Sequence, residues 1–273
     1  MRSAAAALAL AACATGPKIL ARGTLAYDVA AGGPLVATIE LDTAFRLVLR
    51  ASGTTRSVEL GPPDRDFVHL AVDGAGTEIA VAGLDGTVRL FGADGTERDR
   101  WRLDAAATAV ALSADGRYLI HGAASGVLCL RRAEDGALLQ CVVAHDGRVT
   151  GLAIDGDVLV STGADGRAIV WSLPSLRVVA SHAAGAPIQA AALQGGRVAL
   201  ACGARVLVWR VAGDRVESEA PGTATALIFL PDGRLRTSSA RGLALAPDGR
   251  TLYVASWTSA DLRGASLSAI SLP

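Results

Sequence analysis

Residues 145–171 read HDGRVTGLAIDGDVLVSTGADGRAIVW, and this stretch decides the fold. Two short apolar runs, 149–154 and 158–163, are separated by a turn, and a third run ends in the large residue Trp171. The pair Asp165-Gly166 lies between the second and third runs, and such pairs accept the positive φ that tight hairpin turns require. No 3.6-residue amphipathic period runs through the segment, so we predict successive antiparallel strands.

The same pattern of apolar runs and turns recurs along the chain at a regular interval. Asp85, Ser125 and Asp165 are evenly spaced, and Trp171 and Trp209 are separated by nearly the same interval. Four antiparallel strands repeated at this interval are the sequence signature of a β-propeller blade. We therefore predict an all-β chain that forms a single β-propeller of four-stranded antiparallel blades. Five units follow from this register, at residues 24–62, 67–104, 107–144, 149–182 and 188–220.

The C-terminal part is less regular. Its expected strands are residues 225–230, 234–237, 243–245, 251–255 and 267–270. They can form one full blade with a spare strand, or two thin blades, and we favour seven blades over six. Residues 18–21 can pair with the C-terminal strand, because closing the ring removes two exposed sheet edges. Further Asp-Gly turns are expected at 115–116, 135–136, 232–233 and 248–249.

These repeats resemble the WD-repeat propellers, most closely in the fourth unit. In that family a His before a blade, a Ser on its second strand, an Asp in the next turn and a Trp on its third strand form a hydrogen-bonded tetrad. The matching residues here are His145, Ser161, Asp165 and Trp171. The resemblance covers residues 24–257, although the Trp-Asp dipeptide that names the family is absent.

The tetrad pattern decays outside the fourth unit. The third unit has His121, Ser125 and Arg131 at the Ser, Asp and Trp positions, and the fifth keeps Trp209 with His182 as a candidate partner. A His, an Asp and a Ser close together also invite comparison with a catalytic triad. We assign the tetrad to stability, because a buried network satisfies polar groups inside a blade.

The N-terminus is typical of a secretory signal. Arg2 precedes a short apolar run that is too short to span a membrane. Leu10-Ala11-Ala12-Cys13 resembles a bacterial lipobox, in which the peptide is cut before the cysteine and the cysteine carries lipid. The resemblance implies a signal peptide at 1–12, a short tether at 13–23 that includes the ring-closing strand, and a propeller at 24–273 in the bacterial cell envelope. An uncleaved N-terminus would instead make the protein a cytosolic WD-repeat scaffold.

Composition and motifs argue against several other functions. The 273 residues include 26 Lys and Arg and 26 Asp and Glu, so the zero net charge argues against nucleic-acid binding, and we expect membrane contact only through lipid at Cys13. No glycine-rich loop leads from a strand into a helix, so no nucleotide site is expected. We expect no cofactor and no metal, because no histidine lies three or four residues from another or from a cysteine. The four histidines are His69, His121, His145 and His182.

Two further residue sets have alternative interpretations. Cys129 and Cys141 lie nearly opposite each other across a hairpin. They could form a disulfide in an oxidising compartment, but we expect two small buried thiols. Arg98, Arg100 and Arg102 alternate along a fourth strand, which places them on one exposed face. This arginine patch is either a docking surface for an acidic partner or the charge that protects an edge strand from aggregation.

The resemblance implies a non-catalytic protein-interaction platform that displays loops on a rigid ring. We expect a monomer with an unidentified protein partner, and we assign no catalytic residue. The alternative is a propeller enzyme or a cofactor-linked subunit, because residues 243–255 resemble repeats of lactonase-like and quinoprotein-dehydrogenase-like propellers.

Overall fold

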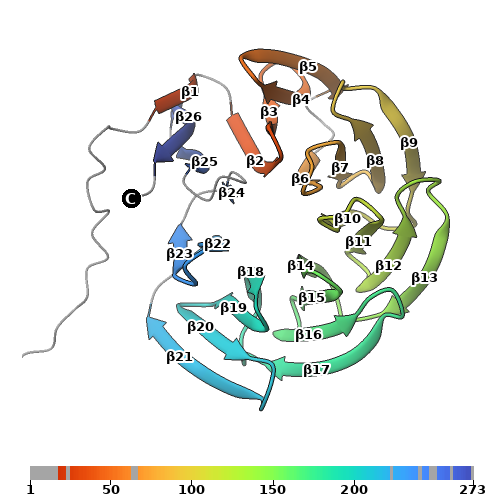
Figure 1. Ribbon diagram of the computed structural model, residues 1–273, viewed down its shortest axis with the longest axis vertical. Coiled ribbons are helices and arrows are strands. Elements are labelled where there is room, and N and C mark those ends of the chain that lie inside the picture. Colours follow the sequence, from red (N-terminus) through yellow and green to blue (C-terminus); the bar gives the residue numbers. More distant parts are fainter. Residues whose placement is uncertain are drawn as a thin grey trace, which may run out of the picture.

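The computed structural model describes residues 18–22, 25–62, 67–221, 224–238, 242–245, 251–258 and 261–271. These residues form seven antiparallel sheets placed around a central axis (Figure 1). Six of the sheets have four strands and one has two. The described ranges contain no helix that is long and apolar enough to cross a membrane.

Each of the first five sheets is built from four strands that are consecutive in the chain. The strands of the first two sheets are β2 (Leu25–Gly32), β3 (Leu35–Leu41), β4 (Phe45–Ala51), β5 (Thr54–Gly61), β6 (Phe67–Val72), β7 (Glu78–Gly83), β8 (Thr87–Gly92) and β9 (Glu97–Arg102). Those of the next three are β10 (Ala107–Leu112), β11 (Tyr118–Ala123), β12 (Val127–Arg132), β13 (Leu138–Val143), β14 (Val149–Asp155), β15 (Val158–Gly163), β16 (Arg167–Ser172), β17 (Arg177–Ala183), β18 (Ile188–Gln194), β19 (Arg197–Cys202), β20 (Arg205–Arg210) and β21 (Arg215–Pro221). Each sheet coincides with one predicted unit.

The C-terminal part forms two sheets rather than one blade with a spare strand. One sheet is β22 (Ala226–Phe229) with β23 (Leu235–Ser238), and the other joins β24 (Gly242–Leu245), β25 (Thr251–Thr258), β26 (Asp261–Ser271) and β1 (Lys18–Arg22). In the latter, β1 pairs with β26, so that Lys18 lies opposite Ala269. The all-β propeller is confirmed. The count of seven blades stays a prediction, because the sixth sheet has only two strands among the described residues.

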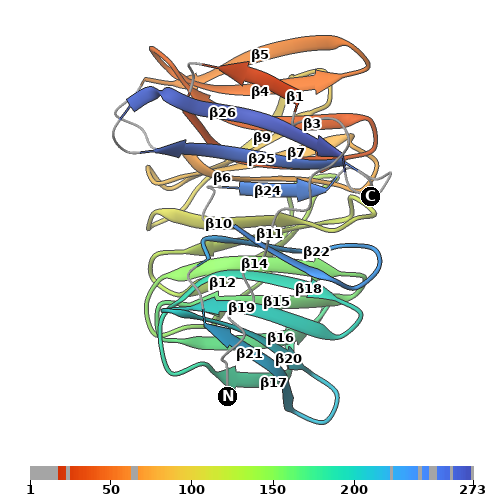
Figure 2. The same cartoon turned by 90° about the vertical axis from the view of Figure 1, so that its left-hand side faces the viewer.

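The innermost strands close the ring. Along the sequence β2, β6, β10, β14, β18, β22 and β24 each contact the next, and β24 contacts β2. Figure 2 shows this closure from the side, with β24, β25 and β26 facing the viewer. The first and last described strands, β1 and β26, pair in one sheet. This pairing joins the two ends of the chain and closes the ring.

The hydrophobic core lies between neighbouring sheets. Phe45 of the first sheet packs in one cluster with Ile79 and Phe91 of the second. Val160 of the fourth sheet packs in the same way with Trp209 of the fifth. Tight turns let the strands double back, and the glycine of each predicted Asp-Gly pair within the described residues has a positive φ. These glycines are Gly116, Gly136, Gly166 and Gly233, whereas 248–249 lies outside the described residues.

The cysteine pair differs from the expectation. Cys129 on β12 and Cys141 on β13 are directly opposite, with their Cα atoms 4.1 Å apart, and a disulfide joins them. The expectation of two free thiols is therefore wrong. The physical reason is register: directly opposed residues in an antiparallel pair place their side chains on the same face, close to each other. Cys202 on β19 is a free, buried thiol.

Candidate functional site

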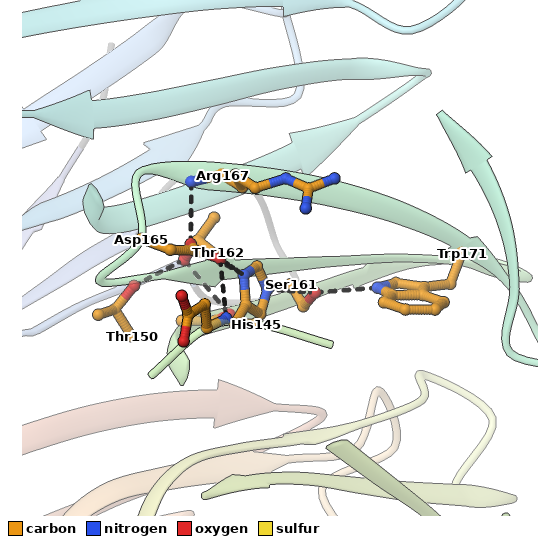
Figure 3. Close-up of polar contacts among 9 residues, drawn as sticks. His145, Thr150, Ser161, Thr162, Asp165, Arg167 and Trp171 are labelled. Atoms are coloured by element: carbon orange, nitrogen blue, oxygen red, sulfur yellow. Dashed lines mark hydrogen bonds and ion pairs between the residues drawn. The ribbon is translucent and has the colours of Figure 1, made fainter. Parts of the chain in front are cut away.

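The four tetrad residues converge from separate elements of the fourth sheet. His145 lies in the connection from β13 to β14, Ser161 is on β15, Asp165 is in the turn that follows, and Trp171 is on β16. Figure 3 shows His145 between Asp165 and Ser161, with the indole of Trp171 reaching Ser161 from the other side. The structure thus brings together all four residues that the sequence singled out.

The hydrogen bonds of the tetrad form a chain with a defined direction. The indole N–H of Trp171 donates to Ser161 Oγ at 2.9 Å, and Ser161 Oγ lies 2.9 Å from His145 Nε2. His145 Nδ1 lies 3.1 Å from Asp165 Oδ1. A carboxylate only accepts, so Nδ1–H of His145 donates to Asp165, and Nε2 accepts the hydroxyl proton of Ser161. Every polar side-chain group in this series then has a partner.

Burial sets the charge state of the tetrad. Burial lowers the pKa of His145 more than the adjacent Asp165 carboxylate raises it. Burial raises the pKa of Asp165, but hydrogen bonds from the backbone N–H groups of Arg167 and Asp146 outweigh it, so this pKa lies below its usual value. The histidine is therefore neutral and the aspartate is ionised near pH 7.

Ser161, His145 and Asp165 are hydrogen-bonded in the order of a Ser-His-Asp catalytic triad, but the serine oxygen is not accessible to a substrate. A catalytic serine must present its oxygen to a substrate, whereas Ser161 is 0% exposed and its Oγ already contacts both His145 and Trp171. This arrangement stabilises the blade by satisfying buried polar groups. The tetrad therefore holds the connection before β14 against the turn that follows β15.

Two neighbouring sheets replace the tetrad in different ways. In the fifth sheet, the indole of Trp209 donates to Asp214 at 2.9 Å and stacks on His182 with the ring centres 5.3 Å apart. In the third sheet, Arg131 Nε donates to His121 Nε2 at 3.3 Å. Asp214 was not found from the sequence, because it lies in the β20–β21 turn and the family pattern has no acidic residue there.

The inner strands line a central channel with a volume of about 420 Å³. Its wall is mostly aliphatic residues, with Asp28 and His69 as a polar pair whose Oδ2 and Nδ1 atoms are 3.7 Å apart. Asp28 also accepts the backbone N–H groups of Val29 and Leu70, so this carboxylate connects the first and second sheets. Among the described residues, no three His, Cys, Asp or Glu side chains form a group that could hold a metal ion.

The arginine patch lies on β9 as an alternating exposed row. Arg98, Arg100 and Arg102 are exposed while the residues between them are half-buried. Arg98 forms an ion pair with Glu78, and Arg100 donates to both carboxylate oxygens of Glu97 at 2.6 and 2.8 Å. Two of the three charges are thus already compensated within the chain, and a role in partner binding stays a prediction.

Comparisons with known proteins agree with this geometry. The family described as "WD domain, G-beta repeat" matches residues 136–172, a stretch that runs from just before β13 to the end of β16 and contains all four tetrad residues. A chain in the "Crystal Structure of Mitotic Checkpoint Complex" superposes with a TM-score of 0.75 at 17% sequence identity, over 90% of this chain and 86% of that chain. No curated protein matches the sequence.

The sheets and these matches define the class of the protein as a β-propeller, in which residues 136–172 match a WD repeat. In total, 1737 chains of solved structures match. A fold shared so widely hosts many functions, so the role of this chain has to be argued from its own surfaces.

Acidification is expected to destabilise the protein between about pH 6.5 and 4. Burial, and then the charge of Arg131, lowers the pKa of His121 from the usual 6.5 to about 4, and burial also lowers the pKa of His145. Both imidazoles stay neutral in the folded chain while the unfolded chain takes up protons, so the free energy of unfolding falls as the pH falls through this window. Urea unfolding at a series of pH values measures it. The slope should be shallower in His121→Gln, and an equal slope in both proteins would contradict this assignment.

Proposed function

We propose that this protein is a non-catalytic protein-interaction platform whose contact surface lies on the outer strands of the third, fourth and fifth sheets. Large aliphatic side chains are exposed there, up to 80% for Val143. They form the outer belt, which consists of Leu138, Leu139, Val143, Val178, Val179 and Val216. Contiguous exposed apolar side chains on a soluble fold mark interaction sites.

Five of the six belt residues lie at the same place in each outer strand, whereas Val143 is at the other end of β13. Leu138, Val178 and Val216 each pair with the residue at the Trp position of their sheet, namely Arg131, Trp171 and Trp209. Each outer strand has a bulge directly after this residue, which leaves Leu139 and Val179 without a partner on the neighbouring strand. Strands β13, β17 and β21 follow one another along the rim in Figure 1, so the belt spans three consecutive sheets.

The outer strand of the second sheet has charged residues where the belt has aliphatic ones. At the same position on β9, opposite Phe91, the chain has Glu97, and the bulged residue is Arg98. Charged side chains on an outer strand prevent edge-to-edge association. The third and fourth sheets carry aliphatic side chains at both positions, and the fifth sheet carries Val216 at the first of them. This favours a partner protein that presents an aliphatic surface of its own.

Introducing charge into the belt should abolish partner binding without unfolding the ring. A photo-crosslinking amino acid at positions 139 and 179 should capture the same protein in cells, whereas position 55 on β5, also exposed, should not. The purified partner should then bind the double variant Val178→Lys, Val179→Lys at least about tenfold more weakly than the wild type. Thr55→Lys is the matched control. Equal affinity for the belt variant would overturn the platform proposal.

We also propose that the platform is an envelope lipoprotein anchored at Cys13, a residue outside those that the structure describes. The lipobox-like Leu10-Ala11-Ala12-Cys13 supports this. Membrane fractionation and intact mass of the native protein, beside Cys13→Ala, test it. We expect a wild-type chain that begins at Cys13 with an added lipid mass and a variant that leaves the membrane. A soluble chain that retains Met1 would contradict the proposal.

A further inference from the structure

The sixth sheet has two strands among the described residues, whereas each of the first five sheets has four. In the second sheet residues 84–86 form the turn from the second strand to the third, and in the fourth sheet residues 164–166 do so. After β23, residues 239–241 lead instead to β24, the innermost strand of the next sheet. Three residues span at most about 11 Å, so this connection cannot supply another strand.

The backbone of β23 offers a hydrogen-bonding edge. The carbonyl groups of Arg234 and Ser238 accept backbone N–H groups from the residues that flank β22. Successive residues of a strand point their backbone groups to opposite sides, so the N–H and C=O groups of Leu235 and Thr237 point away from β22. No described strand pairs with β23 on that side. An edge of this kind is a template for pairing with another chain.

One side chain of the fifth sheet is incompletely covered beside this edge. The second residue of the third strand is 0% exposed in the second, third and fourth sheets, where it is Val88, Leu128 or Ala168 and packs against the following sheet. Val206 has the same position in β20, and it is only partly buried, as is Leu235 of β23. The sheet that follows Val206 is the two-stranded one, so an added strand would complete its cover.

The existing third strands show which side chains an added strand needs. Phe91, Trp171 and Trp209 lie three residues after the covered position, and each packs in a cluster with the preceding sheet. Side chains alternate between the two faces of a strand. A strand added to β23 therefore needs apolar side chains at alternate positions, with a large one among them, to pack against the fifth sheet.

The position of the edge favours a partner protein as the source of this strand. The outer belt ends at Val216 on β21, and β21 belongs to the sheet next to β23 (Figure 1). A partner on the belt therefore reaches β23 without crossing another sheet. After residue 22, the longest stretch outside the described residues is 246–250, which is too short to form both a strand and its connections.

We propose that the partner on the outer belt adds a β-strand to the edge of β23. The added strand pairs with the N–H and C=O groups of Leu235 and Thr237, and its alternating apolar side chains cover Val206. In strand addition the main-chain hydrogen bonds give affinity, and the alternate side chains give specificity. This inference rests on the proposed function, because the same partner makes both contacts.

The first test uses the full chain and the purified partner that crosslinks at positions 139 and 179. Thr237→Pro removes an N–H that faces away from β22, so the pairing of β22 with β23 is kept. Thr237→Val keeps this N–H and is the matched control. Thr237→Pro should bind the partner at least about tenfold more weakly than Thr237→Val, and both should keep the wild-type circular-dichroism spectrum. Equal affinities of the two variants would overturn the proposal.

Hydrogen exchange tests the added strand directly. The amides of Leu235 and Thr237 should exchange at least about tenfold more slowly in the complex than in the free chain. Unchanged exchange in the complex would overturn the proposal. Protection that is already present in the free chain, and that disappears when residues 1–17 are removed, would also overturn it, because the chain itself would then cover the edge.

The belt variant Val178→Lys, Val179→Lys separates this proposal from the proposed function. Weaker binding by both the belt variant and Thr237→Pro would support the two contacts together. Weaker binding by the belt variant alone would overturn strand addition and leave the belt as the interaction surface. Weaker binding by Thr237→Pro alone would overturn the belt and leave strand addition in place.

Discussion

Trp171→Ala is expected to lower the free energy of unfolding by about 3–5 kcal/mol, which is the range for removing a large buried aromatic side chain. The indole is 4% exposed and packs in one cluster with Ile120 and Leu128 of the third sheet. Its loss leaves a cavity between two sheets and also removes the donor that Ser161 Oγ accepts from. Urea denaturation of the purified protein measures the change.

Trp171→Phe separates the two contributions. Phenylalanine keeps most of the apolar contact but cannot donate to Ser161, so we expect a loss of about 1–2 kcal/mol, the cost of losing one hydrogen bond to a buried hydroxyl. An equal loss in both variants would mean that the hydrogen bond, not packing, dominates. A loss below about 1 kcal/mol in Trp171→Ala would contradict the structural role that we assign to the tetrad.

Gly126→Ala is expected to cost about 3–5 kcal/mol, because two effects add at this position. Gly126 has a φ of +83°, and an added Cβ would lie 2.0 Å from the carbonyl oxygen of His145. The carbonyl of the same glycine accepts the backbone N–H groups of Ala144 and His145. The turn between β11 and β12 thus contacts the connection that carries the tetrad histidine, and a methyl group would push the two apart.

Gly53→Ala is the matched control for this variant. Gly53 has almost the same φ, +81°, but an added Cβ would have nothing within 4 Å. Its cost should be only that of a left-handed conformation, about 1–2 kcal/mol. The difference between the two free energies of unfolding isolates the contact with the His145 connection. Equal losses would show that this close approach does not limit stability.

Much of the architecture could be predicted from the sequence because its signals are local. Short apolar runs and, in several hairpins, Asp-Gly pairs define the strands and turns, and their repetition at a regular interval defines the ring. The tetrad could be predicted as well, since His145, Ser161, Asp165 and Trp171 keep the family spacing. The two C-terminal sheets were harder, because their strands are short and β1 comes from the opposite end of the chain.

Features that depend on pairing register could not be predicted in the same way. The distance between Cys129 and Cys141 depends on how β12 and β13 align, and the bulge after Leu138 shifts that alignment by one position. The exposure of the belt residues could not be predicted either, because Val178 and Val179 have the residue type of core positions. Only the placement of their strand at the rim shows that they face solvent. The expectation of free thiols failed because the exact alignment of β12 with β13 cannot be read from the sequence.

The sequence by itself determined the all-β repeat, the turns, and the residues of the one complete tetrad, because each depends only on neighbours within a single repeat. Only the tertiary structure decided that the cysteines are joined, that six aliphatic side chains face solvent on three consecutive outer strands, and that no described strand pairs with the outer edge of β23. These properties depend on distances between strands and on which neighbour covers a face, and such distances are set when the ring closes.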